Sequence, residues 1–103
     1  MIQYILMTKY RQYFEQMIAE NKELFDRFKM LHDYYMTNPA RYQVAFNVEG
    51  EKVVTVIREY ERRLCGHSEK GQYSKFSAGL ADKFWEQIRK SFPRIDFVGV
   101  KRG

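Results

Sequence analysis

The sequence has one cysteine, two prolines and no long apolar run. A lone cysteine, Cys65, cannot form an intrachain disulfide, which excludes the small secreted domains that depend on such bonds. No apolar stretch approaches the roughly 18 to 20 residues that cross a bilayer, so no membrane span is predicted. The first residues, Met1 to Met7, are too short for the apolar region of a signal peptide. We therefore expect no membrane partner and a cytoplasmic protein, or a virus-encoded one that acts inside a cell.

The motifs of common enzyme classes are also missing. The sequence has no nucleophile elbow, no His-Glu-x-x-His pair and no dinucleotide-binding fingerprint. Lys70 precedes Gly71, which reverses the order found in a phosphate-binding P-loop. The carboxylates are scattered along predicted helices and not paired, as an active site would require. We expect no catalytic residues, no cofactor and a role other than catalysis.

Cys65 and His67 are the nearest approach to a metal or thiolate site. They supply two ligands, whereas a metal site needs three or four. A reactive thiolate needs a hydrogen-bonded base and usually a third group that orients it. The only other histidine, His32, lies on a different predicted helix. Cys65 fits better as a small apolar residue at a helix end, so no metal site is predicted.

What the chain does contain is a regular helical pattern. Its 103 residues, 45% of them hydrophobic and 17% aromatic, suit a single domain over 1–103. Apolar residues recur at alternating spacings of 3 and 4, which predicts a helix over about 9–36 with Thr8 as its N-cap. The positions of this seam are Met7, Tyr10, Phe14, Met17, Asn21, Leu24, Phe28, Leu31 and Tyr35. Asn21 is the polar member, and it either sets the register of a helix pair or marks a break in the helix.

Asn38 and Pro39 predict that one helix ends and the next begins within one short turn. Proline cannot continue a helix but suits its first position, and Asn38 can cap the next helix. A second helix ending at Gly66, and hence a helical hairpin, follows from an apolar stripe of Tyr42, Phe46, Val53, Ile57, Tyr60 and Leu64. The alternative is a β-hairpin over 41–57, because Tyr42 to Val48 alternate and 53–57 are mostly β-branched. The Asn-Pro start and the charged ending favour the helix.

A third amphipathic helix is predicted from Ser74 or Ser77 to Pro93. Its apolar face holds Phe76, Leu80, Phe84, Ile88 and Phe92. Both ends of the chain alternate in polarity, around Tyr4 and Phe97, and could pair as a two-stranded ribbon. The predicted fold class is therefore mainly α: a long antiparallel helical hairpin, a third amphipathic helix and short extended N- and C-terminal segments.

The excess of positive over negative charge lies wholly in the second half. Residues 1–51 carry a net charge of −1, whereas residues 52–103 carry +6. A basic half with interspersed tyrosines is compatible with nucleic-acid binding, although no known binding motif is present. The candidate residues for such binding are Arg58, Arg62, Arg63, Lys70 and Lys75. Arg58 and Arg62 are four apart, so they would share one face of a helix.

The length of the first apolar seam points to another kind of partner. A helix of this length exceeds what so small a fold easily covers, so part of it could pack on a second copy. The candidate interface residues are Tyr10, Phe14, Met17 and Asn21. We expect a small basic helical interaction module that binds a protein partner or itself, with nucleic-acid binding through the basic C-terminal half as the alternative.

Overall fold

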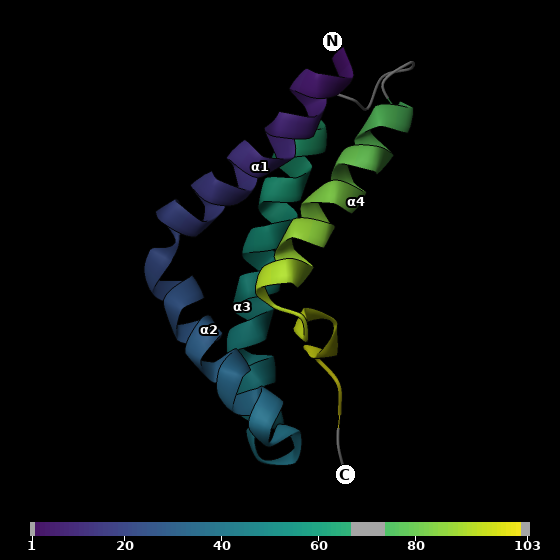
Figure 1. Cartoon of the computed structure of the whole chain (residues 1–103). Coiled ribbons are helices and arrows are strands. Elements are labelled where there is room, and N and C mark those ends of the chain that lie inside the picture. Colours follow the sequence, from purple (N-terminus) through teal and green to yellow (C-terminus); the bar gives the residue numbers. More distant parts are fainter. Residues whose placement is uncertain (1, 67–73, 102–103) are drawn as a thin grey trace.

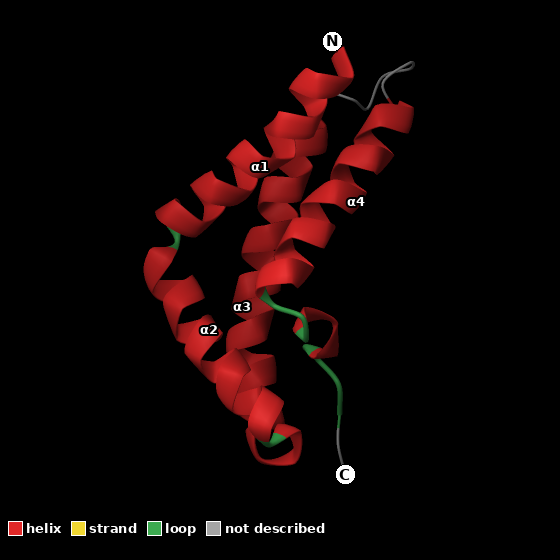
Figure 2. Ribbon diagram, viewed as in Figure 1, coloured by secondary structure: helices red, strands yellow, loops and turns green. Residues whose placement is uncertain are grey.

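The computed structural model describes residues 2–66 and 74–101, with side chains from residue 9 in the first range and from residue 79 in the second. It contains α1 (Ile2–Glu20), α2 (Lys22–Thr37), α3 (Pro39–Cys65), α4 (Ser74–Ser91) and a short 3₁₀ helix, η3 (Ile95–Phe97). No strand occurs in these two ranges (Figure 2). The mainly helical prediction is confirmed. The alternative of a β-hairpin over 41–57 is wrong, because α3 runs through the whole of that segment.

α3 is the central element (Figure 1). α1 and α2 follow one another along it, α2 packs on its N-terminal half, and α4 packs on both α1 and the C-terminal half of α3. The chain after α4 then runs beside the N-terminal half of α3. α3 is thus covered by α1 and α4 over its C-terminal half, and by α2 and the short segment after α4 over its N-terminal half.

The bend between α1 and α2 lies at Asn21, where a continuous helix over 9–36 was predicted. Asn21 has φ −126° and ψ 37°, outside the helical range. Its side-chain Nδ2 and its backbone N–H both donate to the Met17 carbonyl, at 3.1 Å each. Asparagine competes in this way with regular helical hydrogen bonding. The prediction of a break in the helix at Asn21 is therefore confirmed, and the prediction of one continuous helix over 9–36 is wrong.

The turn between α2 and α3 has the chemistry predicted from its sequence. Asn38 Oδ1 accepts a hydrogen bond from the Arg41 N–H at 3.2 Å, and Pro39 occupies the first helical position. Proline needs no amide partner there, and its fixed φ suits a helix start. The N-cap prediction for Asn38 is confirmed.

An aromatic core joins α2, α3 and the end of α4. The Tyr35 and Phe46 rings stack with centroids 4.0 Å apart, and Phe28 lies 5.2 Å from both Phe46 and Phe92. Stacked and tilted ring pairs of this kind add to the stability gained from apolar burial. In the other half of the molecule, Met17, Leu80, Phe84 and Ile88 are buried between α1, α3 and α4.

The predicted terminal ribbon is not formed. Residues 2–6 belong to α1, and Ile95–Phe97 form a 3₁₀ helix. Alternation over so few residues fits a helix as well as a strand, because positions four apart also share a helical face. Ile95 is buried in the core, so burial against the helices replaces strand pairing.

Candidate binding groove between α3, α4 and the C-terminal segment

Residues 94–100, here called the C-terminal segment, are held on α3 by side-chain amides. Gln43 Nε2 donates to the Phe97 carbonyl at 3.2 Å, and Asn47 Nδ2 donates to the Val100 carbonyl at 2.9 Å. Asn47 Oδ1 accepts from the Gly99 N–H at 2.8 Å. Because Gln43 and Asn47 are four apart, they lie on the same face of α3 and can satisfy the backbone of a non-helical neighbour.

A glycine in the middle of α3 lets this segment come close. A Cβ added to Gly50 would lie 2.5 Å from Val98 Cγ2, a distance that real Cβ contacts do not show. Gly50 is buried and helical, so its role is to make room for Val98 and not to permit an unusual backbone angle. Gly99, which follows, has φ +91°, a region that favours glycine.

His32 holds the other end of the segment. Its side chain is fully buried, and its Nε2 accepts a hydrogen bond from the Arg94 N–H at 3.0 Å. An accepting Nε2 places the ring proton of the neutral imidazole on Nδ1. Burial, and then the nearby positive charge of Lys29, lower the pKa of His32 below its ordinary value.

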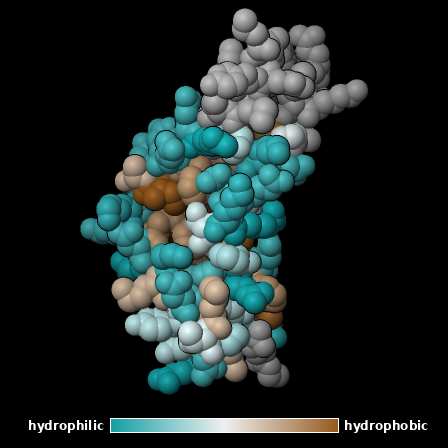
Figure 3. Space-filling view, in the orientation of Figure 1, coloured by the Kyte–Doolittle hydropathy of each residue, from teal (hydrophilic) through white to brown (hydrophobic). Residues whose placement is uncertain are grey.

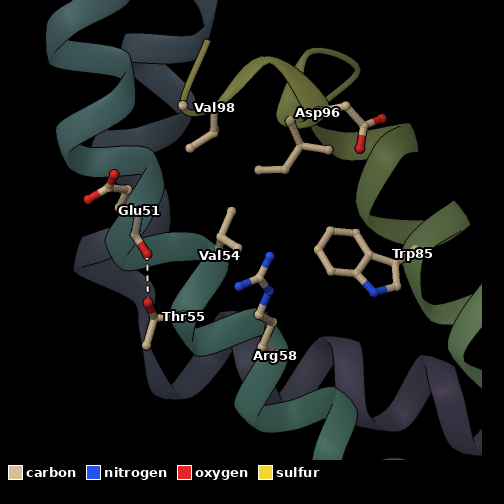
Figure 4. Close-up of a pocket in the computed structure, with 9 residues that line it drawn as sticks. Glu51, Val54, Thr55, Arg58, Trp85, Asp96 and Val98 are labelled. Carbon is tan, nitrogen blue, oxygen red and sulfur yellow. Dashed lines mark hydrogen bonds between the residues drawn. The ribbon is translucent and has the colours of Figure 1, made fainter. Parts of the chain in front are cut away.

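The C-terminal segment forms one wall of an open hollow of about 450 Å³ between α3 and α4 (Figure 4). α3 supplies the floor and a second wall, and Trp85 of α4 supplies the third. We call this hollow the groove; it is lined by Glu51, Val54, Thr55, Arg58, Trp85, Ile95, Asp96, Val98 and Gly99.

The Trp85 ring is fixed in place by its neighbours. Its indole N–H donates to Glu61 Oε2 on α3 at 2.8 Å, and the Arg89 guanidinium lies over its ring at 5.6 Å from the centroid. Arg89 is itself paired with both carboxylate oxygens of Asp96, at 2.9 and 3.2 Å. These contacts tie α4 to both α3 and η3, so the groove has a preformed aromatic wall.

Arg58 is the charged side chain that projects into the groove. Figure 4 shows it extending between Val54 and Trp85, whereas the carboxylates of Glu51 and Asp96 point away from it. Within the described ranges Arg58 makes neither an ion pair nor a side-chain hydrogen bond. The site therefore combines a guanidinium that has no partner in the described part of the chain with a partly apolar lining, which suits a ligand that carries an anionic group beside an apolar one.

A second hollow, between α2 and α3, lacks this combination. It is lined by Leu24, Val48 and Val56 among others, and it contains Arg27 and Lys52. Both cations are close to Glu49, at 3.9 and 3.3 Å respectively. Figure 3 shows a mainly hydrophilic face with an apolar area near the junction of α1 and α2. Among the described residues that line it, this second hollow offers apolar area, and its cations, Arg27 and Lys52, both lie close to Glu49.

The basic residues predicted to bind nucleic acid are not all brought together. Arg58 and Arg62 are exposed and four apart on one side of α3. Arg63 is directed elsewhere, since its Nη2 donates to Glu59 at 2.8 Å and its guanidinium lies 4.8 Å from the centre of the Tyr60 ring. Lys70 and the side chain of Lys75 lie outside the described residues.

Two of the four residues predicted to form an interface between copies are buried within the protein, and the other two are partly buried. Met17 is fully buried and Tyr10 is 8% exposed. Phe14 packs partly on the core, and Asn21 is at the bend, hydrogen-bonded to Met17. An interface through all four would require α1 to separate from α3 and α4.

Cys65 is the last residue of α3, whereas His32 of α2 packs against Phe46 in the N-terminal half of α3. His67 is outside the described residues. Burial, and then the charge of Glu61, raise the pKa of the Cys65 thiol, which disfavours a reactive thiolate. In the described part of the chain, no three His, Cys, Asp or Glu side chains are grouped as metal ligands would be.

Several residues of the groove were not anticipated from the sequence. No site role was predicted for Trp85, Gln43, Asn47 or Gly50. One signal in the sequence could have indicated them. Gln43, Asn47 and Gly50 follow one another at spacings of four and three beside the apolar stripe of the same helix. His32 was considered only as a metal ligand.

Comparisons of the chain with protein-family models, curated proteins and solved structures gave no match. Among the described residues, no helix combines the length and the apolar character needed to cross a membrane.

Proposed function

We propose that this protein is a small interaction module whose groove binds a segment of a partner protein. The bound segment carries a carboxylate for Arg58 next to an apolar side chain for the walls formed by Val54, Trp85 and Val98. The observation that supports this proposal is the Arg58 guanidinium, which projects into a partly apolar groove without a partner among the described residues. A cytoplasmic setting, suggested by the single cysteine, is part of the proposal.

The chemistry favours a single carboxylate over a bare anion. A guanidinium matches a carboxylate with two parallel hydrogen bonds, and such charged bonds are stronger where water is partly excluded. Trp85, Val54 and Ile95 supply apolar area that a free inorganic ion would not use. A peptide side chain placed there adds burial to the ion pair, which is how preformed pockets gain specificity.

Nucleic-acid binding is the second candidate, because Arg58 and Arg62 form a row on α3 beside an aromatic ring. Such rows follow a phosphate backbone while bases stack on aromatic residues. However, Glu51 and Asp96 line the same groove and Glu61 holds Trp85. A polyphosphate along the row would pass these carboxylates, whereas a short acidic segment needs only Arg58. The charge distribution therefore favours a protein partner.

A peptide-display selection tests this proposal directly. Random peptides would be selected on the wild-type protein, on Arg58→Gln and on Arg62→Gln, a matched control one helical turn away. We expect the wild type and Arg62→Gln to enrich Asp or Glu beside an aromatic or aliphatic residue. Arg58→Gln should bind these peptides about tenfold or more weakly, because a charged hydrogen-bonding partner is lost. The proposal would be overturned if Arg58→Gln enriched the same peptides as the wild type to the same degree, or if the peptides that the wild type enriches lacked acidic residues.

Fluorescence anisotropy measurements of binding to short DNA and RNA distinguish the second candidate, nucleic-acid binding, from peptide binding. Affinity that falls steeply between about 50 and 200 mM salt would indicate phosphate contacts and counterion release. We expect no such binding, because Arg63 is paired with Glu59, so that Arg58 and Arg62 alone form the row among the described residues.

A further inference from the structure

We propose that the protonation state of His32 controls whether the groove is closed or open on its C-terminal side. Neutral His32 holds the C-terminal segment against α3, and protonated His32 releases it. The effect on ligand binding rests on the proposed function, whereas the release of the segment does not.

The hydrogen bond between His32 and the segment requires a neutral ring. Nε2 accepts from the Arg94 N–H at 3.0 Å, so a proton on Nε2 would set two donors against each other. Nδ1 is buried and has no hydrogen-bond partner among the described residues. Protonation would therefore create a buried cation, remove the bond from the Arg94 N–H, and leave Nε2–H without an acceptor as Nδ1–H already is, which is strongly unfavourable.

The surroundings of His32 do not offset that cost. Phe28, Phe46 and Phe92 lie around the ring, with centroids about 6 Å away. The charged groups facing it are Lys29 and Asp33 from α2 and Arg94 from the C-terminal segment. Asp33 Oδ1 is 3.9 Å from Nδ1, but this carboxylate is 61% exposed and also lies 3.6 Å from Lys29 Nζ. α3 contributes Phe46 to this contact and no charged group.

Release at Arg94 would reach the groove because the next residues build its wall. Ile95, Asp96, Val98 and Gly99 follow within five positions of Arg94, and all four line the groove. The other attachments are the hydrogen bonds of Gln43 and Asn47, which lie on a partly solvent-accessible face, the pairing of Asp96 with Arg89 of α4, and the buried side chain of Ile95. Loss of the His32 anchor shifts the balance of these remaining contacts towards separation of the wall from α3.

The direction of the pH effect follows from linkage. The pKa of His32 in the folded protein lies below the ordinary value of about 6.5, so the released form binds more protons. The attached state is therefore fully favoured above about pH 6.5 and is lost as the pH falls below it. The change can reach about tenfold in the ratio of released to attached protein for each pH unit.

Trp85 and the Gly99 amide report on the wall in the absence of any ligand. Trp85 is the only tryptophan, and it faces the segment across the groove. Between pH 7.5 and 5.5 we expect a shift in Trp85 emission, together with a change in the Gly99 amide resonance as its bond to Asn47 breaks. His32→Gln keeps an acceptor that does not titrate, so it should remove both changes. His67→Gln, the matched control at the other histidine, should keep them.

An unchanged pH response in His32→Gln would overturn the proposal. Should that variant fail to fold, the His32 ring-nitrogen resonances of the wild type give a second test. The pH midpoint of their titration must equal the pH midpoint of the change in the Gly99 amide resonance. Different midpoints would overturn the proposal.

Peptide binding separates this inference from the proposed function. Peptides selected at pH 7.5 should bind up to about tenfold more weakly per pH unit below 6.5. A segment that detaches in a protein that binds no peptide contradicts the proposed function alone. Peptide affinity that stays constant while the segment detaches contradicts control of the groove by His32.

Discussion

The two halves of α3 are covered by different means. Over the C-terminal half, α4 packs through fully buried apolar residues such as Phe84 and Ile88. Over the N-terminal half, the C-terminal segment is held by His32, Gln43 and Asn47 and by the fit of Val98 against Gly50. Apolar burial involves no titrating group, whereas a few directed hydrogen bonds depend on the protonation state and presence of each donor and acceptor. The difference predicts a firmly packed α4 beside a C-terminal segment that can detach by itself.

The largest effect is expected in the α4 half. Phe84→Ala removes a fully buried ring, and such changes cost about 3–5 kcal/mol of the free energy of unfolding. Denaturant titration followed by circular dichroism measures the loss. A loss below about 1 kcal/mol would mean that α4 does not pack as described, since that is the range of mild surface changes.

Gly50→Ala should be the largest change in the other half. Its Cβ would clash with Val98, which costs about 1–3 kcal/mol. The gain from replacing a helical glycine, about 0.5–1 kcal/mol, offsets only part of this. Gly79→Ala, in α4 with no atom within 4 Å of the added Cβ, is the matched control and should stabilise the protein. If both variants were stabilised in chemical unfolding, the segment would not occupy its place on α3.

Asn47→Ala should have a smaller effect, which is confined to the C-terminal segment. It removes the acceptor for the Gly99 N–H and the donor to the Val100 carbonyl. Two such bonds contribute about 1–2 kcal/mol in all. Amide exchange should become faster at Gly99 while exchange in α4 is unchanged. Uniformly faster exchange would show that the two halves unfold together.

The smallest effect is the dependence of stability on pH. Because the pKa of His32 is lowered on folding, its contribution is complete above about pH 6.5 and declines as the pH falls. The free energy of unfolding of the wild type should fall relative to His32→Gln, by up to about 1.4 kcal/mol per pH unit. Parallel curves for the two proteins between pH 7.5 and 5.5 would contradict this assignment.

Local sequence signals predicted the elements but not the groove. Asn38 and Pro39 mark the turn because capping and proline chemistry act within a few residues. Asn21 marked a break for the same reason. The contact of Asn47 with Gly99 joins residues 52 apart, and that of His32 with Arg94 joins residues 62 apart. No local pattern encodes such pairs. Arg58 was singled out for its charge, but its aromatic neighbour Trp85 comes from another helix and depends on how the helices pack.

The independence of the two halves is tested most directly by hydrogen exchange of the whole chain at pH 7.5 and 5.5, corrected for intrinsic rates. We predict that amides of the C-terminal segment, Gly99 above all, lose protection at the lower pH while those of α4 keep theirs. Exchange that changes equally in both regions, or in neither, would contradict the account.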